Sequence, residues 1–211
     1  MTIDSGALAV AGRGEAIDAK RNQFDATARA GAAAGADERR ALAEAALGAI
    51  RYADPASWTT ATAIAQAITA QRDAVLAAHD RVGVIVTSAE GPVEAMAAMN
   101  DAAKSGSSSP IRFPASNAGS LAGIPSIGFT FRGPTLMLTL PPDRGVPIGL
   151  LLADAWIRRG HADYVVIAAT SRIDGKPAAR SLLIGSPGKA EAALDRDRDG
   201  AWLAALPEAA R

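Results

Sequence analysis

The most restrictive feature of this sequence is a long ordered block that begins at Phe113 and ends at Thr170. A Gly/Ala-rich segment leads through a corner at Gly133 and Pro134 into the apolar run TLMLTL, which is typical of a strand. A tight turn over residues 140–145, an amphipathic helix and a second strand, DYVVIAAT, follow. Strands that alternate with helices in this way favour a parallel sheet with helices on its faces.

The rest of the chain continues this alternation. Short apolar runs predict strands, and apolar residues at helical spacing predict helices, the first with Asp37 as its N-cap. The predicted strands span residues 6–12, 81–87, 135–140, 164–169 and 181–185. The predicted helices span residues 37–50, 59–78, 92–103 and 148–159. The sequence therefore predicts an α/β fold with a mainly parallel five-stranded sheet and helices on its faces.

The chain is predicted to divide into an α/β domain over residues 1–188 and a C-terminal helical tail over residues 189–211. A chain of 211 residues can bury a substantial core. Alanine supplies much of the 49% apolar content and aromatic residues only 4%, so we expect helices that pack closely on the sheet.

Charge and cysteine content exclude several classes of function. The 22 basic residues balance the 22 acidic ones, so no overall basic field attracts nucleic acid or a membrane surface. Without cysteine there is no disulfide, no thiolate nucleophile and no cysteine-ligated metal. The N-terminus lacks the basic region of a signal peptide, and no run reaches about 18 apolar residues. We expect a cytoplasmic protein that binds neither nucleic acid nor membrane.

Two short patterns match ligand-binding motifs only in part. Residues 195–200 fit the start of an EF-hand calcium loop, but its twelfth position is Leu206 instead of a glutamate, and a solvated acidic turn is the favoured interpretation. Gly12 and Gly14 follow the first strand as in a phosphate loop, without the third glycine or the lysine-serine pair. Calcium and dinucleotide binding stay as weaker alternatives, and we expect no metal and no cofactor.

The blocks RVGVIVTSAEGPVEAM and SPIRFPASNAGSLAGIPSIGFTFRGP carry a resemblance to a known family. From residue 6 to residue 185 the chain resembles the N-terminal half of a β-ketoacyl synthase of the thiolase-like superfamily, and the chain-length-factor relatives of these enzymes. The resemblance implies a thiolase-like half-fold. The positions that match the family pattern are Phe113, Pro114, Ser116, Gly123, Gly133 and Pro134.

The resemblance also implies that the family's chemistry is lost. In the family a cysteine stands on the turn between strand and helix, and here that position falls on Pro142 or Asp143, neither of which replaces the nucleophile. The two catalytic histidines of the family's second half have no counterpart in this sequence. His79 and His161 lie beside predicted strand starts and are interpreted as surface residues. We expect no catalytic residue, and no ketosynthase activity from this chain by itself.

Ketosynthases are dimeric, and their segment that corresponds to Phe113–Phe131 packs at the subunit interface. By this resemblance, the strand after the Gly-Pro corner should run antiparallel to its mate across a dimer. A bulky residue in place of Gly123 should dissociate such a dimer. The expected interface residues are Phe113, Ser116, Gly123, Phe129, Phe131, Gly133 and Pro134.

Two functions of different classes stay open. The first is a non-catalytic subunit that pairs with a ketosynthase or with itself in polyketide or fatty-acid-like biosynthesis, shapes an acyl pocket and meets an acyl carrier protein. Half of a duplicated fold leaves an apolar face, which a partner or the tail with Trp202, Leu203 and Leu206 would cover. The second is an enzyme that uses Asp143, His161 or Ser116 for another acyl-thioester transfer or hydrolysis.

Overall fold

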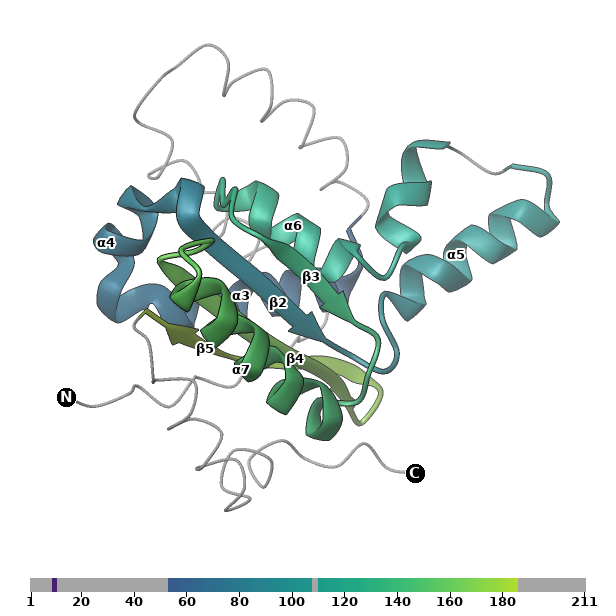
Figure 1. Cartoon of the computed structure of the whole chain (residues 1–211). Coiled ribbons are helices and arrows are strands. Elements are labelled where there is room, and N and C mark those ends of the chain that lie inside the picture. Colours follow the sequence, from purple (N-terminus) through teal and green to yellow (C-terminus); the bar gives the residue numbers. More distant parts are fainter. Residues whose placement is uncertain (1–8, 11–52, 108–109, 186–211) are drawn as a thin grey trace, which may run out of the picture.

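A single mixed sheet organises the protein (Figure 1). The computed structural model describes residues 9–10, 53–107 and 110–185, and its strands lie in the order β1–β5–β4–β2–β3. The strands are β1 (Ala9–Val10), β2 (Val82–Thr87), β3 (Thr135–Leu138), β4 (Tyr164–Ile173) and β5 (Lys176–Ile184). The α-helices are α3 (Pro55–Ile68), α4 (Arg72–Ala77), α5 (Val93–Lys104), α6 (Ser120–Gly128) and α7 (Pro142–Arg158). The 3-10 helices are η1 (Thr69–Gln71), η2 (His79–Arg81) and η3 (Pro110–Ser116).

The pairing of the strands corrects part of the predicted topology. Strand β2 pairs in parallel with β3 and with β4, as the strand–helix–strand order requires. Strand β5 runs antiparallel to β4 and to β1. The α/β class is confirmed, but the prediction of a mainly parallel five-stranded sheet is not. The physical reason is the turn at Asp174 and Gly175, whose φ angles of 51° and 73° suit a two-residue hairpin.

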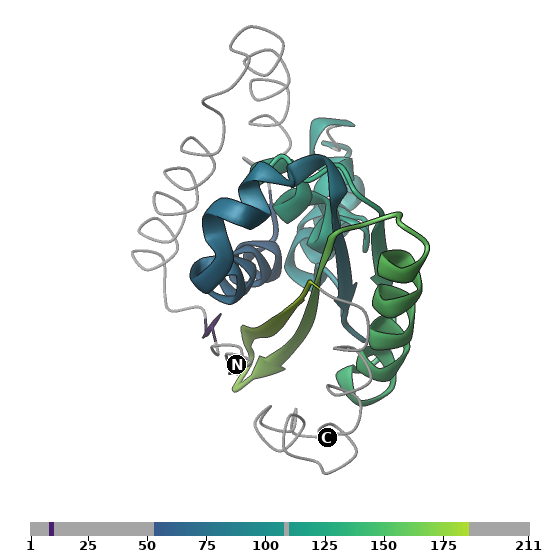
Figure 2. The ribbon, with the colours of Figure 1, turned by 60° about the vertical axis from the view of Figure 1, so that its left-hand side comes forward.

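Helices cover both faces of the sheet, so the core has two layers (Figure 2). On one face, Val84, Val86 and Val166 pack against α3 and α6. On the other face, Ile85 and Ile167 pack against α7. All six residues of β2 are buried, as expected for a central parallel strand covered on both sides.

The helices differ from the predicted ranges where proline and glycine obscure the pattern. The predicted helix 59–78 is α3, η1 and α4 in succession, and it begins four residues early because Asp54 caps α3 with a proline in its first turn. The predicted helix 148–159 begins at Pro142. No helix was predicted between residues 113 and 134, yet α6 forms there with Pro125 inside it.

Several predictions concern parts of the chain outside the described residues. The helix at 37–50, the tail at 189–211 with its acidic turn and most of the strand at 6–12 belong to this group. The domain boundary at residue 188 also stays a prediction. Within the described ranges, no helix combines the length and apolar character needed to cross a membrane.

Helix α7 packs against the sheet through two glycines. A Cβ atom on Gly145 would come within 1.7 Å of Thr87 Oγ1, and one on Gly149 within 3.3 Å of the Ile85 side chain. The two glycines are four residues apart, so they lie on the same side of the helix. The approach of α7 to β2 therefore depends on the absence of side chains at these positions.

Replacing Gly145 with alanine should destabilise the protein by about 1–3 kcal/mol, because the new methyl group overlaps the side chain of Thr87. Thermal unfolding of the variant and of the wild type measures this loss. Gly123→Ala is the matched control, since a Cβ at that position meets no atom within 4 Å. The control should lose nothing and gain up to about 1 kcal/mol from helix propensity. Equal melting temperatures for Gly145→Ala and the wild type would contradict this account of the packing.

Candidate functional site

The turn between β3 and α7 forms an elbow at the carboxyl edge of the parallel strands. Pro141 is the N-cap of α7 and has extended dihedral angles, and a second proline occupies the first helical position. The hydroxyl of Thr87 donates a hydrogen bond of 2.8 Å to the carbonyl of Leu140. The end of β2 therefore fixes the path of the chain through the elbow.

The elbow carries no group that replaces a cysteine nucleophile. Pro142 is partly buried and Asp143 is exposed at the first turn of α7. A carboxylate there complements the positive end of the helix dipole. Pro142 and Asp143, the two positions that the resemblance assigns to the nucleophile, are the first two residues of α7.

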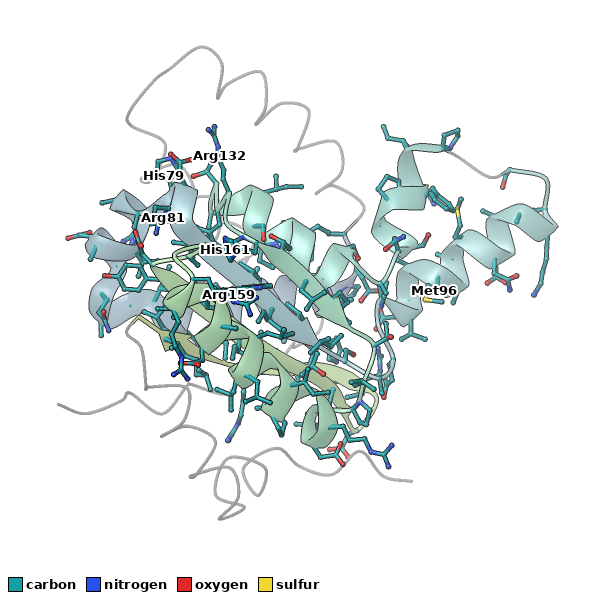
Figure 3. The ribbon with its side chains drawn as sticks, viewed as in Figure 1. His79, Arg81, Met96, Arg132, Arg159 and His161 are labelled. Carbon is teal, nitrogen blue, oxygen red and sulfur yellow. The ribbon has the colours of Figure 1, made fainter. Side chains whose placement is uncertain are left out.

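The side chains named for an alternative enzyme do not come together. Asp143 and His161 lie at opposite ends of α7, whose 17 residues span about 25 Å at the usual rise. Figure 3 shows His161 among His79, Arg81, Arg132 and Arg159 at the far end of the strands. The hydroxyl of Ser116 donates to the carbonyl of Phe113 within η3. No acid–base pair forms from these groups.

Two predicted interface residues lie on the surface. Phe113 is 62% exposed, although aromatic side chains usually find cover. A side chain at Gly123 would meet no atom within 4 Å, so the surface of α6 is open at that point. These two positions are accessible to a partner.

Four other predicted interface residues have a role inside this chain, which corrects the prediction for the two phenylalanines. The rings of Phe129 and Phe131 are buried in the core and stack with centroids 5.2 Å apart. They are unavailable to a partner because the chain's own hydrophobic core already covers them. A Cβ on Gly133 would come within 2.5 Å of the Val82 carbonyl, so only glycine leaves room for β2 at this point. The carbonyl of Pro134 accepts a hydrogen bond from Val84 of β2.

Strand β3 is an open edge of the sheet. It pairs with β2 on one side, and no described strand pairs with its other side. The carbonyl of Pro134 accepts a hydrogen bond from Val84 of β2, and that of Leu138 accepts one from Ser88, directly after β2. Because main-chain groups alternate in direction along a strand, those of Thr135 and Met137 point to the open edge. An edge with unpaired main-chain groups is a template for a strand of another chain.

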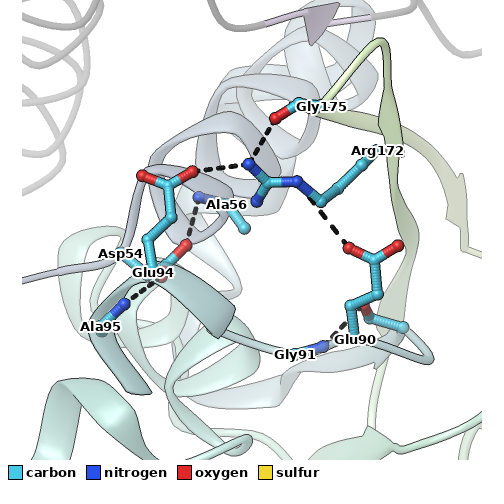
Figure 4. A network of polar contacts seen from close by, with 9 residues as sticks. Asp54, Ala56, Glu90, Gly91, Glu94, Ala95, Arg172 and Gly175 are labelled. Carbon is cyan, nitrogen blue, oxygen red and sulfur yellow. Dashed lines mark hydrogen bonds and ion pairs between the residues drawn. The ribbon is translucent and has the colours of Figure 1, made fainter. Parts of the chain in front are cut away.

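A polar network joins the start of α3, the start of α5 and the hairpin of β4 and β5 (Figure 4). Both carboxylate oxygens of Asp54 accept main-chain hydrogen bonds of 2.8 Å, one from Ala56 and one from Ala95. Arg172 donates to Glu94 over 2.8 Å and lies 3.9 Å from Glu90. Sequence analysis missed this network. The Asp-Pro pair before a helix was a signal for the cap, but the partners of Arg172 come from distant segments.

The sequence matches no family model and no curated protein, so the comparison rests on solved structures. The ishigamide ketosynthase/chain length factor is 12% identical with a TM-score of 0.54, over 64% of this chain and 44% of that chain. A ketosynthase in complex with its chain length factor from Xenorhabdus doucetiae is 17% identical with a TM-score of 0.51, over 89% and 81%. A type II polyketide synthase acyl-carrier protein in complex with its ketosynthase bound to the hexaketide is 15% identical with a TM-score of 0.53, over 91% and 63%.

These comparisons show that the chain has the fold of ketosynthases and chain length factors. The resemblance inferred from the sequence is thereby confirmed at the level of the fold. The chain spans less than half of the ishigamide protein and just under two thirds of the acyl-carrier-protein complex chain. Activity, substrates and partners of those proteins therefore reach this chain only as proposals.

The environment of Asp54 predicts a specific pH dependence. Burial raises the pKa of this carboxyl above its ordinary value of 3.8, and the hydrogen bonds from Ala95 and Ala56 only partly oppose the shift. The folded state then binds the proton more tightly than the unfolded state. The corresponding stability is present at low pH and is lost as the pH rises through the raised pKa. Asp54→Asn cannot titrate, so the wild type should lose stability relative to this variant as the pH rises.

Chemical denaturation of both proteins at a series of pH values above the ordinary carboxyl pKa measures this difference. The asparagine leaves one main-chain N–H without an acceptor, which should cost about 1 kcal/mol at every pH. Subtraction of the two curves removes the contribution of all other carboxyl groups. A difference that is constant with pH, or that grows in favour of the wild type, would contradict the assigned shift.

Proposed function

We propose that this chain is a non-catalytic ketosynthase-like subunit that pairs with a ketosynthase-type subunit, or with itself, in polyketide or fatty-acid-like biosynthesis. The observation that carries the proposal is the combination of a preserved elbow and an absent nucleophile. Pro142 and Asp143 are the first two residues of α7, directly after the turn from β3, and no cysteine occurs in the 211 residues. Condensation by acyl transfer requires such a nucleophile.

The surface that supports pairing is the edge of β3 and the helix beside it. The strand is half-buried, with one exposed and three partly buried residues, and its outer main-chain groups have no partner among the described residues. Ile127 of α6 is 44% exposed, and Phe113 of η3 is 62% exposed. Ile127 lies on a helix that contacts β3, and Phe113 lies on η3, which contacts α6. Exposed apolar side chains of this size are typical of an interface.

The acyl pocket and the carrier protein belong to the same proposal. Two of the structural neighbours pair a ketosynthase with a chain length factor, and a third holds an acyl-carrier protein. By analogy, the partner ketosynthase would provide the nucleophile and this chain would form part of the wall around the growing acyl chain. The carrier protein would deliver acyl groups to the complex.

The alternative, an enzyme with its own acyl-thioester activity, has less support. It would need Asp143, His161 or Ser116 to act on one substrate, but the first two lie at opposite ends of α7. The hydroxyl of Ser116 is engaged with a carbonyl in its own 3-10 helix. A general base must lie within hydrogen-bond reach of the group that it activates.

Co-expression with a cysteine-bearing ketosynthase tests the proposal. We expect the tagged chain to retain that subunit through purification and to be inert alone toward acyl groups carried on an acyl carrier protein or coenzyme A. The complex should condense acyl groups only when the partner's cysteine is present. Hydrolysis or transfer by the isolated chain, together with a monomeric state in solution, would establish the alternative enzyme.

Thr135→Pro should disrupt pairing at the β3 edge. The substitution removes an outward-pointing N–H from an exposed residue and leaves the hydrogen bonds to β2 in place. Thr135→Val is the control, because it keeps the N–H and the β-branched shape. We expect at least a tenfold weaker association for the proline variant by sedimentation or light scattering, with an unchanged melting temperature.

Gly123→Trp tests the same surface by steric exclusion. A Cβ atom at this position meets no atom within 4 Å, and an unchanged melting temperature would show that loss of association reports on the partner and not on unfolding. We expect this variant to be monomeric and folded. If both Gly123→Trp and Thr135→Pro associate like the wild type, the interface lies elsewhere.

A further inference from the structure

Helix α5 is attached to the rest of the protein in an unusual way. None of its 12 residues is buried, and its principal contacts are with η3. Figure 1 shows α5 and η3 projecting together from the sheet. Met96, which Figure 3 labels on this helix, is 49% exposed. An isolated helix of about 12 residues is marginal in water, so the order of α5 depends on what holds its first turn.

Asp54 supplies the N-cap that α5 lacks in its own sequence. The residue at the N-cap position is Pro92, which offers no side-chain acceptor to the free N–H groups of the first turn. Asp54 fills this role from the start of α3, where its other oxygen caps α3 itself. One carboxylate that is 1% exposed therefore joins the first turns of two helices.

Arg172 holds the same turn of α5 from the other side. Its guanidinium donates to Glu94 over 2.8 Å and also to the carbonyl of Gly175 in the turn of the β-hairpin. It lies near Glu90, just before Gly91, whose φ of +67° marks the sharp bend that leads into α5. The arginine side chain is only 23% exposed, so these contacts are partly shielded from water.

We propose that Asp54 and Arg172 form a clasp that seats α5 on the sheet domain, and that α5 leaves this seat as a local unit while the sheet stays folded. Release of the helix takes no buried residue of α5 out of the core, because none of its own residues is buried. What opposes release is the cap, the ion pairs and the packing on η3. Segments held by few apolar contacts open at a lower free energy than the whole protein.

Hydrogen exchange of the main-chain amides tests this proposal on the full chain. In Arg172→Met, we expect the amides of α5 to exchange about tenfold faster, as for the loss of a hydrogen bond to a charged group. The amides of β2 and β4 should keep their rates. Raising the salt concentration should accelerate exchange in α5 of the wild type and have less effect in the variant, because the ion pairs are already absent.

Two further variants separate the clasp from general destabilisation. Arg159→Met removes an exposed arginine at the far end of α7 and should leave exchange in α5 unchanged. Glu94→Gln breaks the same ion pair from the helix, and its effect should not add to that of Arg172→Met in the double variant. Additive effects would overturn the assigned pairing. Exchange of α5 at the same rate as β2 and β4 in the wild type would overturn the local release.

Discussion

The contact between Gly145 and Thr87 sets the position of the elbow on which the remaining architecture depends. The absence of a side chain on the glycine lets the first turn of α7 rest on the end of β2. The threonine hydroxyl at the same point holds the carbonyl of Leu140. The path of the chain from β3 into α7 is thus determined by a close contact between helix and strand and by a hydrogen bond to the main chain. Neither contact involves the side chains of Pro142 and Asp143.

The segment between η3 and β3 serves the interior and the surface at once. Phe129 and Phe131 turn inward and fill the core beneath α3 and α6. Phe113 lies outside the core, and Gly123 leaves the surface of α6 open. A pattern of matched residues does not distinguish these two uses, because burial depends on which face of a short helix each residue occupies. The family likeness pointed to the whole segment, and the structure shows which of its residues are buried and which are exposed.

Elements with a strong local pattern could be predicted from the sequence. Features that depend on contacts between distant segments could not. The buried run of β2 and the helix α5 were predicted nearly to their ends. The antiparallel hairpin was missed although Asp174 and Gly175 form a standard turn pair, because the strands were predicted too short on both sides. The clasp could not be predicted from the sequence, because Asp54 and Arg172 are far apart along the chain and only the fold brings both to the first turn of α5.

The hairpin of β4 and β5 also bears on the order in which the protein folds. Its nine residue pairs are closed by a two-residue turn. Strands β2 and β4 also pair, but α5, α6 and α7 lie between them in the sequence. Local pairs form before distant ones because closing a short loop costs less chain entropy. The hairpin can therefore act as a preformed template, and completion of the parallel strands becomes the slow, late event that creates the exposed edge of β3.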